Sequence, residues 1–264
     1  MSEKTAVAVL LGGRNSENYR SCQSARDVID ALEEKGYQVT AYGMSMEANW
    51  ISFGDLNSLK NALKKDNFEL TEESIKDISE VTESLLPPTS LLETTVVFST
   101  LMGSWGSDGT IQGMLETEIV RFVGSDTLGG AISSDKSTAK LLMEAVEIPT
   151  PKHVIVPDRS WRRDPVSNVM RAASLKVPLV AKPARGSNGV GVSYIRVPRD
   201  FKKGIEISRN FDGRVIVEKY HEPKQLFECN ILEDEKGKIV LSEIIQTNFK
   251  TKDKVFNFIS RSDK

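Results

Sequence analysis

A short apolar run closed by two glycines constrains the fold of this chain most strongly. Residues 6–11 are all apolar, and Gly12 and Gly13 follow at once. Such a run is typical of a strand that is buried on both faces of a parallel sheet. Apolar residues recur at helical spacing within residues 21–35, and a second strand is expected over residues 39–42. We therefore expect a βαβ unit at the start of the chain.

The rest of the first lobe is less regular in sequence. Residues 47–94 are polar and rich in Lys and Glu, with partial helical periodicity, and they predict one or two surface helices. A buried strand is expected over residues 95–100. A glycine-rich turn at 103–109 then leads into a helix over 110–118, and a short strand at 121–124 closes the lobe.

A second lobe is expected to begin with a helix near Ser134, with Ala139, Leu142, Met143 and Val146 on one face. An α+β succession follows, with a helix within 165–176 and strands at 153–156, 178–182, 191–195 and 214–218.

Two further strand-like runs, 227–232 and 239–244, flank Lys236 and Gly237, which can turn a hairpin. A hairpin needs another surface to cover it, so we expect a third, incomplete lobe here. The expected domains are residues 1–130, 131–220 and 221–264.

The composition excludes several classes of function. The 264 residues carry a net charge of -2, which gives no general attraction for nucleic acid. No apolar run approaches the ~20 residues that span a bilayer, and no secretory signal is recognisable, so we expect a cytoplasmic protein with no membrane partner. Cys22 and Cys229 lack zinc spacing and are interpreted as structural thiols. Neither His153 nor His221 lies in a pattern typical of a metal ligand or a catalytic base.

Residues 180–192 are the most informative stretch for function. A strand that ends in Lys182 is followed by a turn rich in Gly, Ser and Asn and then by a second strand. Glycines let a backbone approach an anion closely, and a lysine supplies a point charge for phosphate oxygens. The flanking strand and the absence of Gly-Lys-Ser/Thr distinguish this loop from a P-loop. An ordinary glycine-rich hairpin with a surface lysine is the alternative.

Two other segments strengthen the first interpretation. Lys136 lies at the expected start of a helix, and Glu218 and Lys219 end a buried strand. Two lysines around the phosphates of ATP and a carboxylate at the edge of its adenine would form a clamp for the nucleotide. Taken singly, a lysine on a first helical turn is usually solvated, and a Glu-Lys pair at a strand end is usually a surface pair.

The order of these motifs resembles that of the D-alanine:D-alanine ligase family over nearly the whole chain. The matching segments are residues 7–13 with Ser16, Glu17 and Ser21, then 106–113, 122–125, Asp135-Lys136, Lys182-Pro183 with its glycine loop, and Glu218-Lys219.

The resemblance implies an ATP-grasp fold of α/β class, in which a Rossmann-like N-terminal lobe precedes a central α+β lobe and a C-terminal lobe. ATP would lie between the last two lobes. In that reading ATP phosphorylates an amino-acid carboxylate, and the amine of a second amino acid attacks the acylphosphate.

The resemblance also assigns roles to individual residues of this chain. Glu17 would hold the ammonium group of the first D-alanine, and Asn188 takes the place of a loop serine that orients the substrate. The expected nucleotide-binding residues are Lys136, Lys182, Gly186, Ser187, Gly189, Glu218 and Lys219.

The chain departs from the family pattern at several positions. Met102 and Ser107 stand where the family has His and Glu, and Tyr19 replaces a second acidic residue. The catalytic arginine and the Asp, Glu and Asn ligands of Mg2+ would lie beyond Lys264, so we expect this chain alone to be inactive. A ligase for another amino acid or amine, and a non-catalytic relative that binds a nucleotide or a partner, remain alternatives. Exposed apolar edges of the third lobe predict a homodimer.

Overall fold

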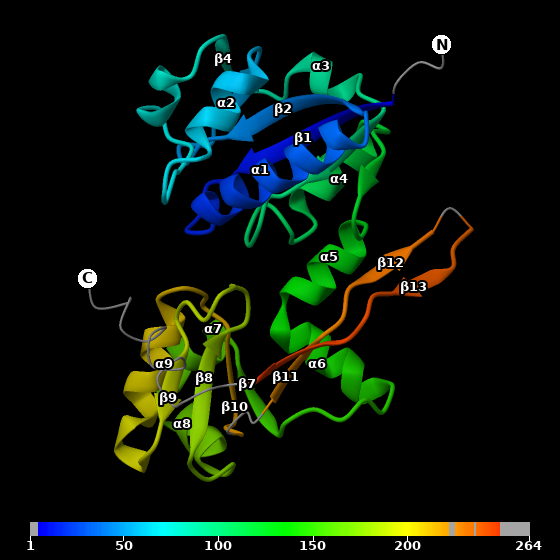
Figure 1. The fold of residues 1–264 in the computed structure, drawn as a ribbon. Coiled ribbons are helices and arrows are strands. Elements are labelled where there is room, and N and C mark those ends of the chain that lie inside the picture. Colours follow the sequence, from blue (N-terminus) through cyan, green and yellow to red (C-terminus); the bar gives the residue numbers. More distant parts are fainter. Residues whose placement is uncertain (1–4, 222–224, 235, 249–264) are drawn as a thin grey trace. The chain divides into compact units, whose positions relative to one another are not determined.

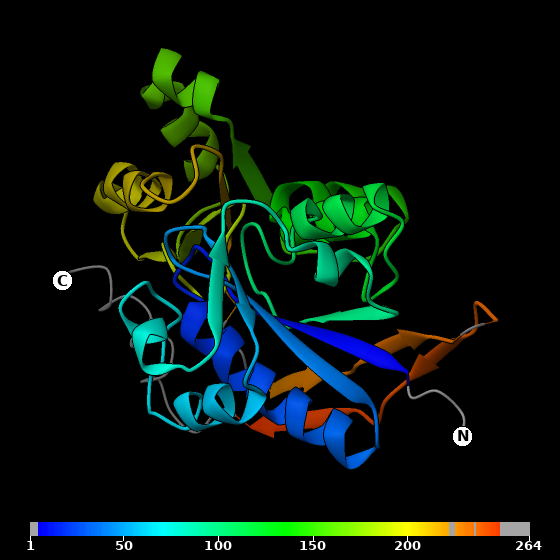
Figure 2. The same ribbon diagram turned by 90° about the horizontal axis from the view of Figure 1, so that it is seen from above.

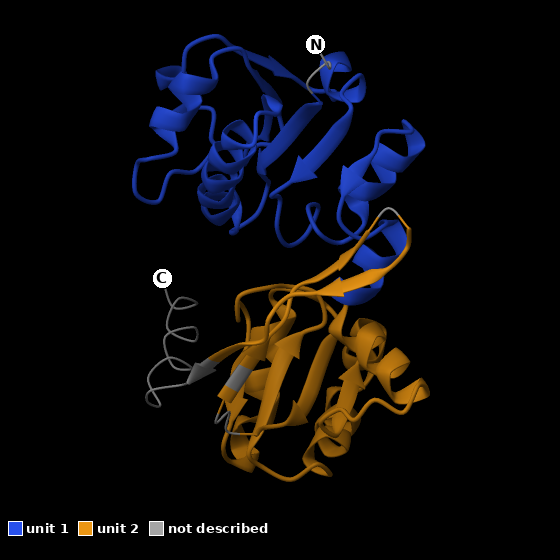
Figure 3. Ribbon diagram, turned by 45° about the vertical axis from the view of Figure 1, so that its right-hand side comes forward, with its two compact units in different colours: residues 1–134 blue, residues 135–264 orange. Residues whose placement is uncertain are grey.

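The computed structural model describes residues 5–221, 225–234 and 236–248. The chain forms two compact units, residues 1–134 and 135–264 (Figure 3). This division does not test the three expected domains, whose boundaries remain a prediction. None of the helices in the described part of the chain has the length and apolar character that crossing a membrane requires.

Unit 1 is built on a six-stranded sheet with the strand order β4-β3-β2-β1-β5-β6. Its strands are β1 (Ala6–Gly12), β2 (Gln38–Met44), β3 (Trp50–Phe53), β4 (Val81–Ser84), β5 (Val96–Ser99) and β6 (Phe122–Val123). Strand β1 pairs in parallel with β2 and β5, and β5 pairs in parallel with β6. The expected βαβ opening and parallel sheet are confirmed.

Helices cover both faces of this sheet (Figures 1 and 2). Unit 1 contains α1 (Asn18–Glu34), α2 (Leu56–Ala62), α3 (Thr89–Leu92), α4 (Thr110–Thr117) and α5 (Thr127–Ser134), of which α5 packs against α4. Because side chains alternate along β1, Val9 and Leu11 join one core with α1 and α2, whereas Ala8 and Leu10 join another with α4. The apolar run at the start of the chain is thus buried on both faces, as its composition predicts.

The expectation of surface helices across residues 47–94 is wrong for much of that stretch. It contains α2 and α3, but also strands β3 and β4, which extend the sheet in antiparallel fashion. Ile75 and Ile78 are buried in the core, in and after a 3-10 turn over Ser74–Asp77, and Val81 begins β4. Ile75, Ile78 and Val81 are spaced three residues apart, as on one side of a helix, but they belong to a turn and a strand.

Unit 2 contains a four-stranded antiparallel sheet with the order β7-β10-β8-β9. The strands are β7 (His153–Val156), β8 (Leu179–Pro183), β9 (Ser193–Ile195) and β10 (Val215–Lys219). The helices are α6 (Lys136–Ala145), α7 (Asp158–Arg163), α8 (Pro165–Ala173) and α9 (Phe201–Arg209), and a 3-10 turn spans Pro198–Asp200.

One face of this sheet carries the core of unit 2. Ala181 and Val217 pack there with Phe201 and Ile205 of α9. Side chains alternate between the two faces along a strand, so Lys182 and Glu218 lie on the opposite face, which we call the second face.

The end of unit 2 folds as a two-stranded ribbon. The ladder β11 (Gln225–Glu228)–β14 (Ile245–Asn248) is followed by the ladder β12 (Ile231–Glu233)–β13 (Ile239–Leu241). Gly237 adopts a φ of 75° in the turn, which confirms the expected hairpin. The expected run 227–232 is interrupted between β11 and β12, and the expected run 239–244 ends with β13 at Leu241, before β14 begins at Ile245.

Candidate functional site

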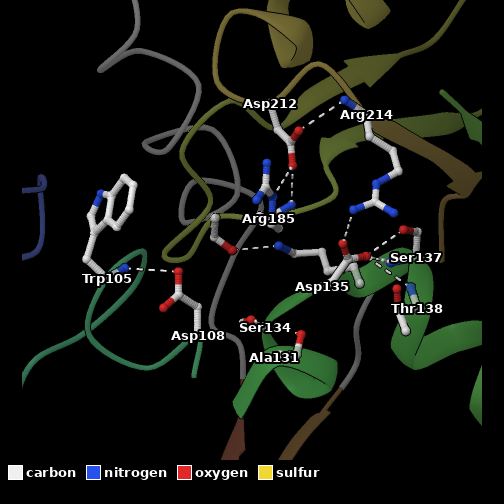
Figure 4. A network of polar contacts seen from close by, with 12 residues as sticks. Trp105, Asp108, Ala131, Ser134, Asp135, Ser137, Thr138, Arg185, Asp212 and Arg214 are labelled. Atoms are coloured by element: carbon white, nitrogen blue, oxygen red, sulfur yellow. Dashed lines mark hydrogen bonds and ion pairs between the residues drawn. The ribbon is translucent and has the colours of Figure 1, made fainter. Parts of the chain in front are cut away.

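An ion pair and a helix cap meet at the start of α6 (Figure 4). One carboxylate oxygen of Asp135 accepts hydrogen bonds from the backbone N–H groups of Ser137 and Thr138, both at 3.0 Å. The other oxygen forms an ion pair with the guanidinium group of Arg214. Burial alone would raise the pKa of Asp135, but the hydrogen bonds and Arg214 outweigh it and hold the pKa below its ordinary value. The carboxylate therefore stays charged.

A second carboxylate fixes the entry to the glycine-rich loop. Asp212 accepts hydrogen bonds from the backbone N–H and the Nε of Arg185, at 2.9 and 3.1 Å. It also accepts one from the backbone N–H of Arg214 at 3.1 Å. The backbone of Asp135 forms an isolated β-bridge with Arg185. These contacts join the start of α6, the end of β8 and the start of β10, as Figure 4 shows.

The loop after β8 depends on glycine at specific positions. Gly186, Gly189 and Gly191 have φ values of 139°, 76° and 72°, in the region that L side chains rarely adopt. A Cβ on Gly191 would lie 2.5 Å from Phe211 and 2.7 Å from Pro183, so a side chain has no room there. Asn188, the position of the expected substrate-orienting residue, is exposed and has a φ of 52°.

Two short turns shape the loop. The carbonyl of Ser187 accepts a hydrogen bond from the backbone N–H of Val190, and that of Gly189 accepts one from Val192, both at 3.1 Å. Ser187 is half-buried. The expected loop residues Ser187 and Gly189 thus begin these two turns, and Gly186 directly precedes the first.

The structure brings the two expected lysines to this loop. The Nζ of Lys136 donates a hydrogen bond to the carbonyl of Gly186 at 2.6 Å. Burial lowers the pKa of Lys136, and the positive charge of Lys182 lowers it further. Lys182 in turn forms an ion pair with Glu218.

Glu218 and Lys219 separate onto opposite faces of β10. Glu218 lies on the second face with Lys182 and is buried. The Nζ of Lys219 instead donates to the carbonyls of Lys176 and Val177, at 2.9 and 3.2 Å. The side chain of Lys219 therefore fixes the chain before β8 and does not share a face with Lys182.

A third lysine, which the sequence reasoning missed, completes the cluster. The Nζ of Lys140 lies 3.1 Å from Oε2 of Glu218, and its side chain is 17% exposed. Burial would raise the pKa of Glu218, but Lys182 and Lys140 together lower it below its ordinary value. One signal was available, because Lys140 follows Lys136 by four residues and so lies on the same side of the helix.

Glu17, the expected ligand of an amino group, belongs to unit 1. It directly precedes α1, is 4% exposed, and lies 3.8 Å from the Nε of Arg20. Its backbone N–H donates to the side chain of Asn15 at 2.8 Å. Asn15 in turn donates to the carbonyls of Met102 and Ser104, at 2.9 and 2.7 Å.

These contacts join the loops that follow β1 and β5. The two strands are adjacent and parallel, and α/β proteins commonly bind ligands at the carboxyl ends of such strands. The guanidinium group of Arg14 stacks on Trp105, 4.8 Å from the ring centroid, and links the same two loops. The sequence reasoning did not single out Arg14 or Trp105.

The described residues do not supply a metal site. No group of three or more His, Cys, Asp or Glu among them is placed to hold a metal ion. Cys22 is buried in the core of unit 1, and burial raises its pKa to about 12, which fits a structural thiol. Lys264, beyond which the metal ligands were expected, lies outside the described residues.

Both units match models of known protein families. Residues 6–125 match the family model described as the D-ala D-ala ligase N-terminus, and residues 142–260 match that of the D-ala D-ala ligase C-terminus. The D-alanine–D-alanine ligase of Corynebacterium glutamicum is 33% identical over 251 residues, which are 91% of this chain and 67% of the relative. That of Paenarthrobacter aurescens is 32% identical over 236 residues, which are 86% of this chain and 62% of the relative.

Solved structures show the same fold. The VanG D-Ala:D-Ser ligase from Enterococcus faecalis superposes with a TM-score of 0.72 at 25% identity, over 92% of this chain and 69% of that one. The D-alanine–D-alanine ligase from Coxiella burnetii superposes with a TM-score of 0.77 at 17% identity, over 98% and 77% of the two chains. The expected ATP-grasp fold is confirmed. The chain belongs to the D-alanine–D-alanine ligase family.

Proposed function

We propose that unit 2 binds ATP, with Lys136 and Lys182 on its phosphates and the loop of Gly186, Ser187 and Gly189 around them. One observation carries this proposal. The ammonium group of Lys136 is held on the carbonyl of Gly186 at 2.6 Å, and Lys182 lies in the strand that leads into the same glycine-rich loop. Like charges at partly buried positions repel each other, and a polyphosphate would relieve that repulsion.

The second face also offers a surface for the base of the nucleotide. Val180 and Ile216 are buried and share the parity of Lys182 and Glu218. Tyr194, which is paired with Val180 across the sheet, stacks edge-to-face on Tyr220 with ring centroids 4.5 Å apart. Aromatic and apolar groups beside a charged clamp suit a purine next to phosphates. In this proposal the strand end at Glu218 and Lys219 borders the adenine.

We further propose that the activity of the whole protein is ATP-dependent ligation of D-alanine to a second amino acid. A carboxylate oxygen of the first amino acid would attack the γ-phosphorus of ATP, and ADP would leave. The amine of the second would then attack the acylphosphate carbon, lose a proton and expel phosphate. Glu17 would hold the ammonium group of the first substrate, because a buried carboxylate binds a cation strongly.

In this mechanism the chain mainly binds and orients the reactants. Lys136 and Lys182 would offset the charge that develops on the transferred phosphoryl group. The glycine-rich loop, with Asn188 at its tip, would cover the phosphates and exclude water that would hydrolyse the acylphosphate. Mg2+ is implied by the family, but the described residues do not fit a metal site, so no step is assigned to the metal.

The chain spans 62% and 67% of the length of the two curated relatives above. The ligase activity of the 264-residue chain therefore needs its own test. The assay supplies ATP, Mg2+ and D-alanine and measures ADP, phosphate and dipeptide. Release of all three that depends on D-alanine supports ligation. ATP binding without turnover in this chain supports the alternative of a non-catalytic nucleotide-binding relative, and absence of ATP binding contradicts the proposal as a whole.

A ligase for a different amino acid is the second candidate. Tyr19, Met102 and Asn188 depart from the family pattern around the substrate, and one structural relative is named as a D-Ala:D-Ser ligase. Competition among D-alanine, D-serine and other amino acids in the same assay identifies the preferred acceptor. A product ratio that favours D-serine would replace the D-alanine assignment.

We also propose a homodimer. Ile231 and Leu232 of β12 and Leu241 of β13 are 65%, 63% and 63% exposed, and exposed apolar strands favour association. Sedimentation equilibrium is expected to give twice the mass of one chain. A monomer at all concentrations contradicts this expectation.

A further inference from the structure

Helix α6 turns charged side chains toward the sheet of unit 2. Lys136, Lys140 and Glu144 recur every four residues and so share one side of the helix. Their contacts are Lys136 with the carbonyl of Gly186, Lys140 with Glu218 at 3.1 Å, and Glu144 with His153 at 3.5 Å. By contrast, Leu142, Met143 and Val146 are 45%, 42% and 66% exposed. The apolar face expected from the sequence is thus exposed, whereas Lys140 is 17% exposed and Glu144, at the end of the charged stripe, is 50% exposed.

Lys140 and Lys182 each form an ion pair with the carboxylate of Glu218. Lys182 pairs with Oε1 and Lys140 with Oε2, and the glutamate side chain is only 7% exposed. A carboxylate at such a position is stable in its charged form only when cations and hydrogen bonds replace water. Lys182 therefore donates a hydrogen bond to one oxygen of this buried acid, and Lys140 places a positive charge beside the other, which accepts no hydrogen bond from the described residues.

A phosphate that recruits Lys182 must compete with Glu218 for that lysine. If Lys182 were the only cation on Glu218, its departure would leave a buried carboxylate unpaired. The same carboxylate would repel the incoming phosphate oxygens. Lys140 reduces both effects, because it keeps a positive charge on Oε2 when Lys182 moves toward the ligand.

We propose that Lys140 is a positioning residue for nucleotide binding, which acts through Glu218 to keep Lys182 available to the phosphates. The inference rests on the ATP binding proposed above, and it assigns to Lys140 no direct contact with ATP. Lys136 and Lys182 are the phosphate ligands, and Lys140 is the counter-ion of the acid beside them.

Calorimetric titration of the 264-residue chain with ATP tests this role. Lys140→Met is expected to weaken ATP binding about tenfold, the size of coupling typical of contacting charged groups. Lys140→Arg keeps the charge and is expected to bind ATP nearly as the parent chain does. The matched control is Lys202→Met, which removes a lysine paired at 3.9 Å with Glu206 on the exposed side of α9; its affinity is expected to be unchanged.

A double-mutant cycle shows whether Lys140 acts through Glu218. In a Glu218→Gln background there is no carboxylate to neutralise, so Lys140→Met is expected to have little further effect on affinity. An equal loss in both backgrounds would mean that Lys140 contacts ATP directly, and it would overturn the inference. A lower melting temperature with unchanged affinity would overturn it as well, because the role would then be structural.

The outcomes separate this inference from the proposed function. If the parent chain binds ATP and Lys140→Met binds it equally well, only the role of Lys140 is wrong. If the parent chain does not bind ATP, the proposed function is wrong and the role of Lys140 is rejected with it. Should Lys140→Met fail to fold, Lys140→Gln keeps a hydrogen-bond donor to Glu218 and replaces it in the cycle.

Discussion

Arg214 forms an ion pair with Asp135, the residue whose side chain also caps α6. Asp135→Ala removes the cap and the ion pair together, and we expect it to lower the free energy of unfolding by about 2 kcal/mol. The matched control is Asp164→Ala, which removes the cap of α8, where the exposed carboxylate accepts one hydrogen bond from Ser167. That variant is expected to lose about 1 kcal/mol. Calorimetric unfolding measures both, and equal losses would show that Arg214 adds no stability.

The assignment of the phosphate ligands predicts that variants in the two units differ. Lys182→Ala removes a charged donor from the strand that leads into the glycine-rich loop, and we expect ATP to bind roughly 10- to 100-fold more weakly. Glu17→Gln changes a residue of unit 1 and is expected to leave ATP affinity intact. Titration of each variant with ATP provides the measurement. Normal ATP binding by both would refute the lysine assignment.

Acid should weaken the fold through Glu218. Its pKa in the folded chain is lowered, so its contribution to stability is present above the ordinary pKa and is lost as pH falls through the folded-state pKa. We therefore expect the free energy of unfolding to fall as the pH drops below the ordinary glutamate pKa of about 4.3, and to fall less steeply in Glu218→Gln. Urea unfolding at several pH values gives these slopes. Glu206→Gln on the surface serves as the control and should follow the parent chain; parallel curves for Glu218→Gln would contradict the prediction.

The glycine-rich loop predicts a steric effect at one position. Gly191→Ala places a Cβ against Phe211 and Pro183, and we expect it to lower the free energy of unfolding by about 2 kcal/mol or more. Gly36→Ala provides the comparison, because Gly36 also has a positive φ, of 83°, but a Cβ there meets nothing within 4 Å. That variant should lose about 1 kcal/mol from backbone strain alone. If both variants lose the same amount, the close approach at Gly191 has no energetic consequence.

Much of the fold could be predicted because periodicity and burial agree. The apolar run of β1 and the helical spacing of α1 correspond to real faces of the structure, and both were predicted correctly. Strands β3 and β4 were missed because these four-residue strands lie in a polar stretch, rich in Lys and Glu, whose apolar residues recur partly at helical spacing. Four residues give too few alternations to distinguish a strand from part of a helix.

The candidate site was predicted only in part. Lys136 contacts Gly186, and Lys182 lies in the strand that leads into the same loop. The pairing of Lys140 with Glu218 joins residues far apart in the sequence, and only the folded chain shows that the acid needs two cations. The side chain of Lys219 was placed with that of Glu218, but neighbouring residues of a strand point to opposite faces.

The charged stripe of α6 matches the sheet strand by strand. Its contacts reach the loop after β8, then β10, then β7, which follows the order in which those strands lie side by side. Four helical residues advance by about 6 Å, and neighbouring strands are about 4.8 Å apart, so an oblique crossing brings one charge to each strand. A residue inserted between Lys136 and Lys140 would rotate the rest of the helix by about 100° and separate Lys140 and Glu144 from their partners together.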